Sequence, residues 1–253
     1  MKFAFFNQKK SDDTAGQVDF DRLPRHIAII LDGNGRWAKK RGLPRTAGHK
    51  VGAETFRTIA TYCRDIGIDY LTVYAFSTEN WKRPQEEVDT IMSLLKKYLL
   101  EAIETMERDN VRLNFMGDMS VLNEELRDLV DQANAISARL DGCQCNICIN
   151  YGGRAEIVAA AKRFAADCTR GEASVDALTE EQFDAYLYSA GIPSPELLIR
   201  PGGEQRLSNF LLWQCAYAEF YYTDVLWPDF SKEDLHQAIA EYQRRNRRFG
   251  GVS

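Results

Sequence analysis

The chain has 253 residues, of which 45% are hydrophobic, and this is enough for one α/β domain with a sizeable core. Its formal net charge of −5 excludes a bulk attraction to nucleic acid, so we expect no nucleic-acid partner. No run approaches the ~18 apolar residues that cross a bilayer, and the apolar stretch near the start is too short for a secretory signal. We therefore expect a cytoplasmic protein.

Residues 1–22 are polar, charged and largely aperiodic, and we expect a flexible N-terminal arm there, followed by a single domain over residues 23–253. Apolar runs beyond the arm predict strands at His26–Leu31, Asp69–Phe76, Val111–Met116, Cys145–Ile149, Leu197–Ile199 and Glu219–Tyr222. Amphipathic intervals predict helices at Gly48–Ile66, Val88–Arg108, Val121–Leu140, Gly153–Cys168, Glu180–Ala190 and Lys232–Arg247.

Strands separated by helix-length segments indicate parallel pairing. We therefore expect an α/β fold in which helices flank a six-stranded, mostly parallel sheet. The helix predicted at Val88–Arg108 has the clearest apolar stripe, which consists of Ile91, Leu94, Leu95, Tyr98, Leu99, Ala102, Ile103 and Met106. Ligands of such folds bind beyond the carboxyl ends of the strands, so we expect functional residues at those ends.

An acidic, glycine-rich turn, Asp32–Trp37, follows the first predicted strand. Glycine lets backbone N–H groups approach a ligand closely, and a helix that begins near Asn34 would favour an anion. Asp32 beside a phosphate suits Mg²⁺, which typically binds one or two carboxylates together with substrate phosphates. A turn with an N-capping aspartate is the alternative. Arg45 and His49 would share one helix face, either as anion ligands or as solvated surface.

The second predicted strand is followed by Ser77–Pro84, where polar and aromatic side chains are concentrated. Ser77 and Asn80 could position or relay a proton, and Trp81 could pack against an apolar chain. A capped loop is the alternative interpretation of the same residues.

Two arginines and a serine surround a Gly-Gly turn late in the chain, at Arg200, Arg206 and Ser208. Because a guanidinium binds phosphate oxygens in bidentate fashion, these groups could clamp a diphosphate, and a salt-bridged surface loop is the alternative. Glu219 lies among aromatic residues, where an acid needs a partner such as a metal ion or an arginine of a second subunit.

Cys143, Cys145 and Cys148 are spaced like metal ligands, but no second CxxC or HxxxH pair follows them. We expect these thiols to pack as small hydrophobic groups in a buried strand. His26 opens a strand, and we expect it to be structural.

Together these blocks resemble the cis-prenyltransferase (undecaprenyl diphosphate synthase) family. The similar segments follow the order of the family across residues 24–251, and they are His26–Ala38, Arg45 with Gly48–His49, Phe76–Trp81, Asn150–Arg154, Arg200 with Gly203–Phe210, and Arg247–Gly251. The sequence departs from the family pattern at Pro201, where threonine is common, and at Gly202, where serine is common.

The resemblance implies an enzyme that condenses isopentenyl diphosphate with an allylic diphosphate such as farnesyl diphosphate. The product would be a long-chain polyprenyl diphosphate such as undecaprenyl diphosphate, the precursor of the lipid carrier for cell-wall synthesis. The resemblance also implies a Mg²⁺ cofactor, a homodimer, and product release through transient contact with a membrane surface.

By position, the resemblance makes Asp32 and Asn80 catalytic. It also makes Asp32 a Mg²⁺ ligand, with Glu219 completing the metal site either within one subunit or across a dimer interface. The allylic diphosphate would be held by Gly33, Asn34, Gly35, Arg36, Arg45 and His49. Isopentenyl diphosphate would be held by Arg200, Arg206 and Ser208, next to Leu207. The remaining residues implied in substrate binding are Trp37, Ser77, Thr78, Glu79, Trp81 and Arg83.

The growing chain would be apolar, and burial is worth about 0.8 kcal/mol per CH₂, so each five-carbon addition favours an apolar tunnel. We expect a minority of the stripe on Val88–Arg108 to line this tunnel and the rest to pack on the sheet. One rival hypothesis is a non-catalytic subunit of a heteromeric prenyltransferase, which should lack Asp32, Asn80 or the clamp of Arg200, Arg206 and Ser208, all of which are present. The other is a nucleotide-binding or phosphatase-type α/β enzyme.

Overall fold

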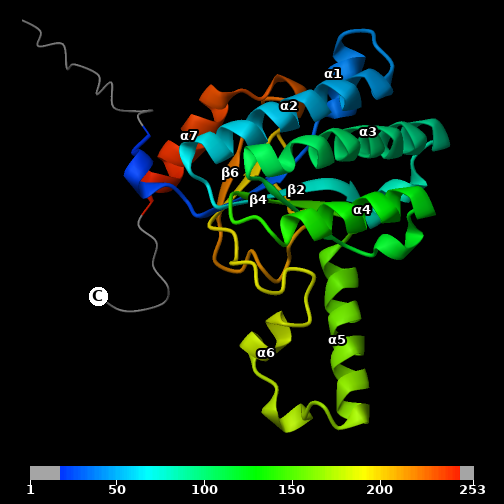
Figure 1. Ribbon diagram of the computed structural model, residues 1–253. Coiled ribbons are helices and arrows are strands. Elements are labelled where there is room, and N and C mark those ends of the chain that lie inside the picture. Colours follow the sequence, from blue (N-terminus) through cyan, green and yellow to red (C-terminus); the bar gives the residue numbers. More distant parts are fainter. Residues whose placement is uncertain (1–17, 246–253) are drawn as a thin grey trace, which may run out of the picture.

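The computed structural model describes residues 18–245, and Figure 1 shows their arrangement. One sheet contains six strands, which are β1 (His26–Ile30), β2 (Tyr70–Ser77), β3 (Arg112–Met116), β4 (Gln144–Tyr151), β5 (Leu197–Arg200) and β6 (Glu219–Tyr222). The strand order is β3-β4-β2-β1-β5-β6, and every neighbouring pair is parallel. The predicted α/β fold is thus confirmed, and the carboxyl ends of all six strands lie at one edge of the sheet.

The helices are α1 (Asn34–Lys40), α2 (Arg45–Ile66), α3 (Gln85–Asp109), α4 (Glu124–Ser137), α5 (Gly153–Arg170), α6 (Glu180–Asp184) and α7 (Lys232–Arg244). Most of them match the predicted ranges within a few residues. α2 starts at Arg45, directly after Pro44, rather than at the predicted Gly48. This earlier start places Arg45 and His49 on one helix, four residues apart.

The helix predicted over Glu180–Ala190 is wrong beyond Asp184. A capping box between Thr179 and Gln182 starts α6, as the sequence suggests. The backbone N–H of Tyr188, however, donates to the carboxylate of Glu156 at 2.9 Å. The N–H groups of Tyr186 and Leu187 already bond three residues back, to Phe183 at 2.9 Å and Asp184 at 3.1 Å, so the chain has left the i to i−4 ladder before Tyr188 turns to Glu156.

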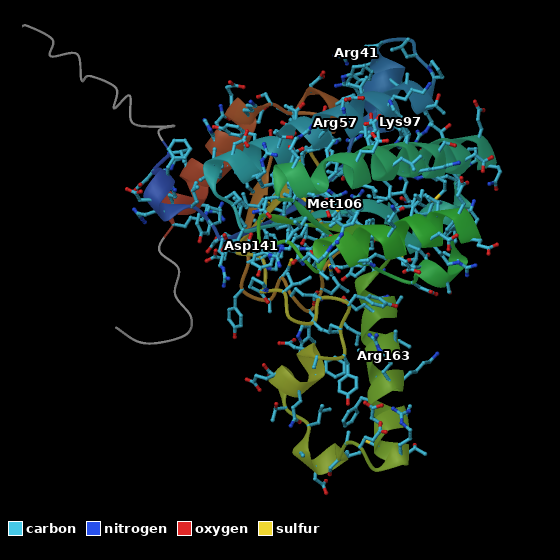
Figure 2. All side chains as sticks on the ribbon, in the orientation of Figure 1. Arg41, Arg57, Lys97, Met106, Asp141 and Arg163 are labelled. Carbon is cyan, nitrogen blue, oxygen red and sulfur yellow. The ribbon has the colours of Figure 1, made fainter. Side chains whose placement is uncertain are left out.

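Apolar side chains cover both faces of the sheet. On one face, α2, α3 and α7 pack through a large core that includes Ile59, Leu99 and Ile239. Met106 of α3 lies within the dense side-chain layer on this face (Figure 2). On the other face, the segment after β5 contributes the buried ring of Phe210. α5 and α6 project from the body of the molecule, away from α1, α2 and α3 (Figure 1).

The three cysteines near β4 are buried, and the expected core packing is confirmed. Cys143 precedes β4, and Cys145 belongs to the core on one face of the sheet. Cys148 belongs to the core on the opposite face.

Of the arm expected over residues 1–22, residues 1–17 lie outside the described part of the chain. Val18 is buried in the large core, and the backbone N–H of Asp19 donates to Gln243 of α7 at 3.0 Å. The block Arg247–Gly251 also lies outside the described residues, and the single domain over residues 23–253 stays a prediction. Within residues 18–245, the structure contains no helix with the length and apolar composition of a membrane span.

Candidate active site

A cavity of about 800 Å³ lies at the carboxyl edge of the sheet, bounded by the strand ends, α1, α2, α3 and the loop after β5. Its interior is mainly apolar, and its opening is charged. We call this opening the polar mouth, and it contains most of the predicted site residues, namely Asp32, Gly33, Asn34, Gly35, Arg36, Arg45, His49, Ser77, Glu79, Asn80, Arg83, Arg200, Arg206 and Ser208.

Asp32 directly follows β1 and lies between two arginines. Its Oδ1 is 3.0 Å from Nη2 of Arg36, and its Oδ2 accepts a hydrogen bond of 2.9 Å from Nη2 of Arg200. The turn depends on Gly33, whose φ of 108° lies in the left-handed region that favours glycine. Gly202 also has a φ in the left-handed region, at 93°, and a Cβ there would lie 2.7 Å from Nη2 of Arg36, so a larger residue would displace that guanidinium.

Arg200 is the last residue of β5, and its side chain is only 4% exposed. Its Nη1 donates to the carbonyl of Arg206 and, at 2.8 Å, to Oγ of Ser208. Its Nε is buried without a hydrogen-bond partner in the described residues. The guanidinium of Arg206 points outward and pairs with Glu204 at 2.6 Å. The three predicted clamp residues are therefore brought together, with one buried cation and one exposed cation.

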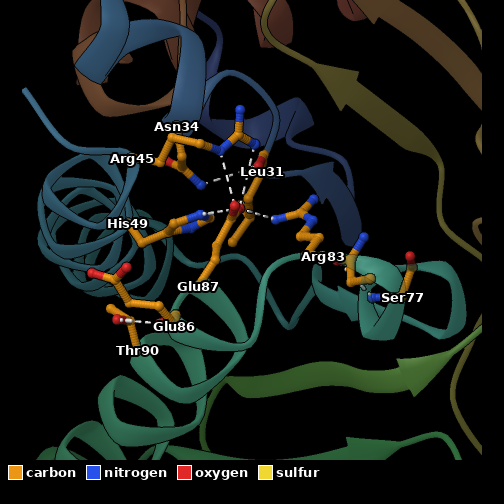
Figure 3. Close-up of polar contacts among 10 residues, drawn as sticks. Leu31, Asn34, Arg45, His49, Ser77, Arg83, Glu86, Glu87 and Thr90 are labelled. Carbon is orange, nitrogen blue, oxygen red and sulfur yellow. Dashed lines mark hydrogen bonds and ion pairs between the residues drawn. The ribbon is translucent and has the colours of Figure 1, made fainter.

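A buried carboxylate, Glu87, organises the other side of the polar mouth (Figure 3). Arg45 donates to it from Nε at 2.8 Å, Arg83 donates from Nη1 at 2.9 Å, and Nε2 of His49 lies 2.9 Å from its Oε1. The sequence analysis missed Glu87. Its signal was its position four residues after Arg83, in the first turn of a helix that starts after Pro84.

The surroundings of Glu87 keep it ionised. Burial would raise its pKa, but hydrogen bonds from Arg45 and His49 and the charge of Arg83 lower the pKa to about 2. Burial lowers the pKa of His49 below its usual value, although the bond to Glu87 opposes this effect. At neutral pH a neutral His49 can donate its Nε2 proton to the carboxylate.

Ser77 and Asn80 form a reciprocal capping box just beyond β2. Oδ1 of Asn80 accepts from the backbone N–H of Ser77 at 3.1 Å, which fixes the Asn80 carboxamide at the cavity wall. Glu79 accepts a hydrogen bond of 3.0 Å from Asn209, another cavity-lining residue that the sequence analysis did not single out. Its signal was its position directly after Ser208 in the similar segment.

Four of the predicted substrate-binding residues do not line the cavity, namely Trp37, Thr78, Trp81 and Leu207. The indole of Trp37 donates to Asp229 at 2.6 Å, and the indole of Trp81 donates to Asn150 at 2.8 Å. Thr78 packs near Gly152, and Leu207 packs against the core that contains Phe210.

Glu219, the second predicted metal ligand, lies at the opposite edge of the sheet. It begins β6 beside Leu197, the first residue of β5, whereas Asp32 follows the carboxyl end of β1. Its carboxylate pairs with Arg245 at 2.7 Å. Within one chain the structure therefore does not bring Glu219 to Asp32.

The apolar interior depends heavily on α3. Most residues of the predicted apolar stripe line the cavity, namely Ile91, Leu94, Leu95, Tyr98, Leu99 and Ala102. The prediction that only a minority of the stripe would do so is therefore wrong. The reason is that α3 lies beside α2 at this edge, and the space between these helices and the sheet is only partly filled.

A divalent cation fits the donor set of the polar mouth only together with its substrate. Residues 18–245 contain no group of three or more histidine, cysteine or acidic side chains arranged to hold a metal ion. Asp32 is a partly exposed carboxylate at the cavity wall. Such a single carboxylate suits Mg²⁺, which takes its remaining ligands from phosphate oxygens and water.

A parallel α/β sheet with an arginine-rich mouth over an apolar cavity defines a class of enzyme whose ligands have an anionic head and an apolar tail. Comparisons with known proteins agree. A family model described as "Putative undecaprenyl diphosphate synthase" matches residues 30–250. The chain is 49% identical to an isoprenyl transferase of Clostridium perfringens over 98% of both chains. It is 53% identical to one of Listeria monocytogenes over 91% of both chains.

A solved structure is similar as well. The structure of lavandulyl diphosphate synthase from Lavandula x intermedia, in complex with dimethylallyl diphosphate, has a TM-score of 0.87 and 38% identity. The alignment covers 90% of this chain and 99% of that one. The chain therefore belongs to the undecaprenyl diphosphate synthase family of cis-prenyltransferases and is an isoprenyl transferase. The family is consistent with a divalent-metal-dependent enzyme.

Proposed function

We propose that the protein elongates an allylic diphosphate, farnesyl diphosphate, by successive condensation with isopentenyl diphosphate in cis geometry. The product is a long-chain polyprenyl diphosphate such as undecaprenyl diphosphate, the precursor of the lipid carrier for cell-wall synthesis. The observation that carries this proposal is the polar mouth, with its arginines on both sides of Asp32, over an apolar cavity of about 800 Å³. The lavandulyl enzyme's bound dimethylallyl diphosphate, itself an allylic diphosphate, supports the substrate class.

The polar mouth has two cationic sides, which suits two diphosphates. Arg36, Arg45 and His49 bind the allylic diphosphate on the side where α1 and α2 begin. Arg200, with Arg206 and Ser208, binds isopentenyl diphosphate. Asp32 contacts both sides through Arg36 and Arg200. Its carboxylate is therefore well placed to act between the two head groups.

In the reaction, the C–O bond to the allylic diphosphate breaks and a C–C bond to isopentenyl diphosphate forms. Asp32 would hold Mg²⁺, which would supply stabilisation of the negative charge on the departing diphosphate. The arginines supply the same stabilisation from fixed positions. Asn80, fixed by Ser77, assists transfer of the proton that the condensing unit loses to an oxygen of the departing diphosphate. Glu219 contributes to the metal site only if a second subunit presents it.

We further propose a cytoplasmic homodimer that releases its product at a membrane surface. α5 and α6 project from the body, and the side chain of Val158 on α5 is 54% exposed (Figure 1). β6 is an edge strand whose residues are only half-buried. Exposed apolar groups and an open sheet edge are typical of a surface that a second copy covers.

The test is incubation of the purified protein with farnesyl diphosphate, labelled isopentenyl diphosphate and Mg²⁺, followed by mass analysis of the products. We expect labelled polyprenyl diphosphates that differ by five-carbon units. Release of inorganic phosphate without a longer isoprenoid, or no label in any lipid product, would contradict the proposal.

A further inference from the structure

The turn between α1 and α2 is basic, although the chain as a whole carries a net charge of −5. No aspartate or glutamate occurs from residue 33 to residue 53. Arg36, Arg41 and Arg45 are each paired with a carboxylate. Lys39 and Lys40 are exposed, and neither pairs with an acid in the part of the chain that the structure describes. These two lysines therefore present uncompensated charge to solvent.

The backbone of the turn is held in one conformation. The N–H of Leu43 donates to the carbonyl of Ala38 at 3.0 Å, and that of Gly42 donates to Lys39 at 3.2 Å. With Gly42 at a φ of 67°, this is the Schellman pattern that ends many helices. Leu43 nevertheless remains 45% exposed. A rigid turn thus displays one leucine beside two lysines, and little conformational freedom is lost when it docks.

This turn lies beside the polar mouth. Figure 1 shows α1 and the turn at the outer end of the molecule, and Figure 2 places Arg41 there. Arg45, the residue after Pro44, lines the cavity. The lysines and Leu43 therefore lie close to the opening through which substrate and product must pass.

We propose that the basic turn, residues 39–44, docks the polar mouth against an anionic phospholipid surface. Lys39 and Lys40 are attracted to lipid head groups, and Leu43 enters the apolar boundary beneath them. The inference rests on the proposed function, in which amphiphilic prenyl diphosphates pass through this opening. The exposed Leu43 favours a lipid surface over nucleic acid as the partner. Both carry phosphate charges, but only a bilayer has an apolar layer beneath its charged head groups.

The experiment measures co-sedimentation of the full chain with vesicles of equal parts phosphatidylglycerol and phosphatidylcholine, and with vesicles of phosphatidylcholine alone. We expect the wild-type protein to bind the anionic vesicles, to bind less at high salt, and to leave neutral vesicles in the supernatant. Each charge contributes about fivefold near an anionic surface, and Lys40→Glu changes the charge by two, so it lowers binding by about 25-fold. Leu43→Ser lowers vesicle binding still more than Lys40→Glu does, because it removes the side chain that enters the apolar boundary.

The matched controls are Arg127→Glu, at an exposed position on α4, and Val175→Ser, at an exposed valine far along the chain. Both should bind vesicles as the wild type does. Turnover in detergent, without vesicles, should be the same for all four variants and tests the proposed function separately. The docking inference is overturned if Lys40→Glu binds like the wild type, or if an active wild-type protein ignores anionic vesicles. Equal, Lys40-dependent affinity for duplex DNA would overturn it as well.

Discussion

At the scale of single residues, the carboxylate of Glu87 determines where three hydrogen-bond donors of the polar mouth lie, namely two arginines and one histidine. Arg45 is 59% exposed along its side chain, so without Glu87 it would sample many conformations in solvent. Glu87 reduces the net positive charge of the site, but it also holds Arg45, His49 and Arg83 in fixed positions. Because fixed donors stabilise developing charge without reorganisation, we expect positioning to outweigh the lost charge.

Glu87→Gln tests this balance. The variant keeps the side-chain shape but loses the charge that holds three donors, so we expect kcat/KM for the allylic diphosphate to fall by about ten- to a hundredfold. Steady-state kinetics with varied farnesyl diphosphate measure the change. Glu86→Gln is the control, because Figure 3 shows Glu86 pointing away from the cluster. An unchanged or higher kcat/KM for Glu87→Gln would show that the net positive charge of the site matters more than the fixed positions of its three donors.

His26 gives a prediction about stability. Burial lowers its pKa to about 4, while a hydrogen bond with the carbonyl of Pro193, at 2.6 Å, partly opposes the shift. Since the folded pKa lies below the usual 6.5, the associated stability is present above pH 6.5 and is lost as the pH falls toward 4. The full loss is about 3 kcal/mol. Urea unfolding at pH 7 and pH 4.5 should show this slope in the wild type and a smaller one in His26→Gln.

At the scale of elements, sequence patterns predicted the strands and the long helices because each has a strong apolar period of its own. The same reasoning located Asp32, Asn80 and Arg200, since each follows a recognisable strand. It failed where a long-range contact decides the outcome. The segment after α6 does not continue the helix, and Tyr188 there bonds to Glu156 of another element. Glu87 joins Arg45 only after two helices pack at one sheet edge.

The apolar face of α3 makes a prediction about product length. Ala102 lines the cavity about 22 Å along the helix axis from Glu87, and it is the smallest side chain of the cavity-lining stripe. Ala102→Phe should therefore obstruct the cavity and shorten the main product by at least one five-carbon unit. Leu100→Phe, at a 43% exposed position on the same helix, should leave the length unchanged. Mass analysis of the products compares the two, and unaltered lengths for Ala102→Phe would place the growing chain elsewhere.

At the scale of the whole molecule, the strand order places β1 between β2 and β5. This order brings Asp32 next to Arg200 and places Asn80 on the wall of the same cavity, although these residues are far apart in sequence. A polar mouth and an apolar interior then follow from one arrangement, because α2 and α3 cover the face of the sheet behind the strand ends. The family membership and the shape of the cavity both support the proposed reaction, in which an apolar chain grows from a diphosphate head group.

The central claim is that Asp32, held between the two arginine sets, lies where bonds break and form. The most direct measurement is the turnover of Asp32→Ala with farnesyl and isopentenyl diphosphates, with folding checked by circular dichroism. We expect a loss of at least about a hundredfold with the fold retained, because the carboxylate between the head groups is removed. Asp69→Ala, at a surface ion pair with Arg25 on the opposite edge, should keep its turnover. Near wild-type turnover of a folded Asp32→Ala would contradict the account.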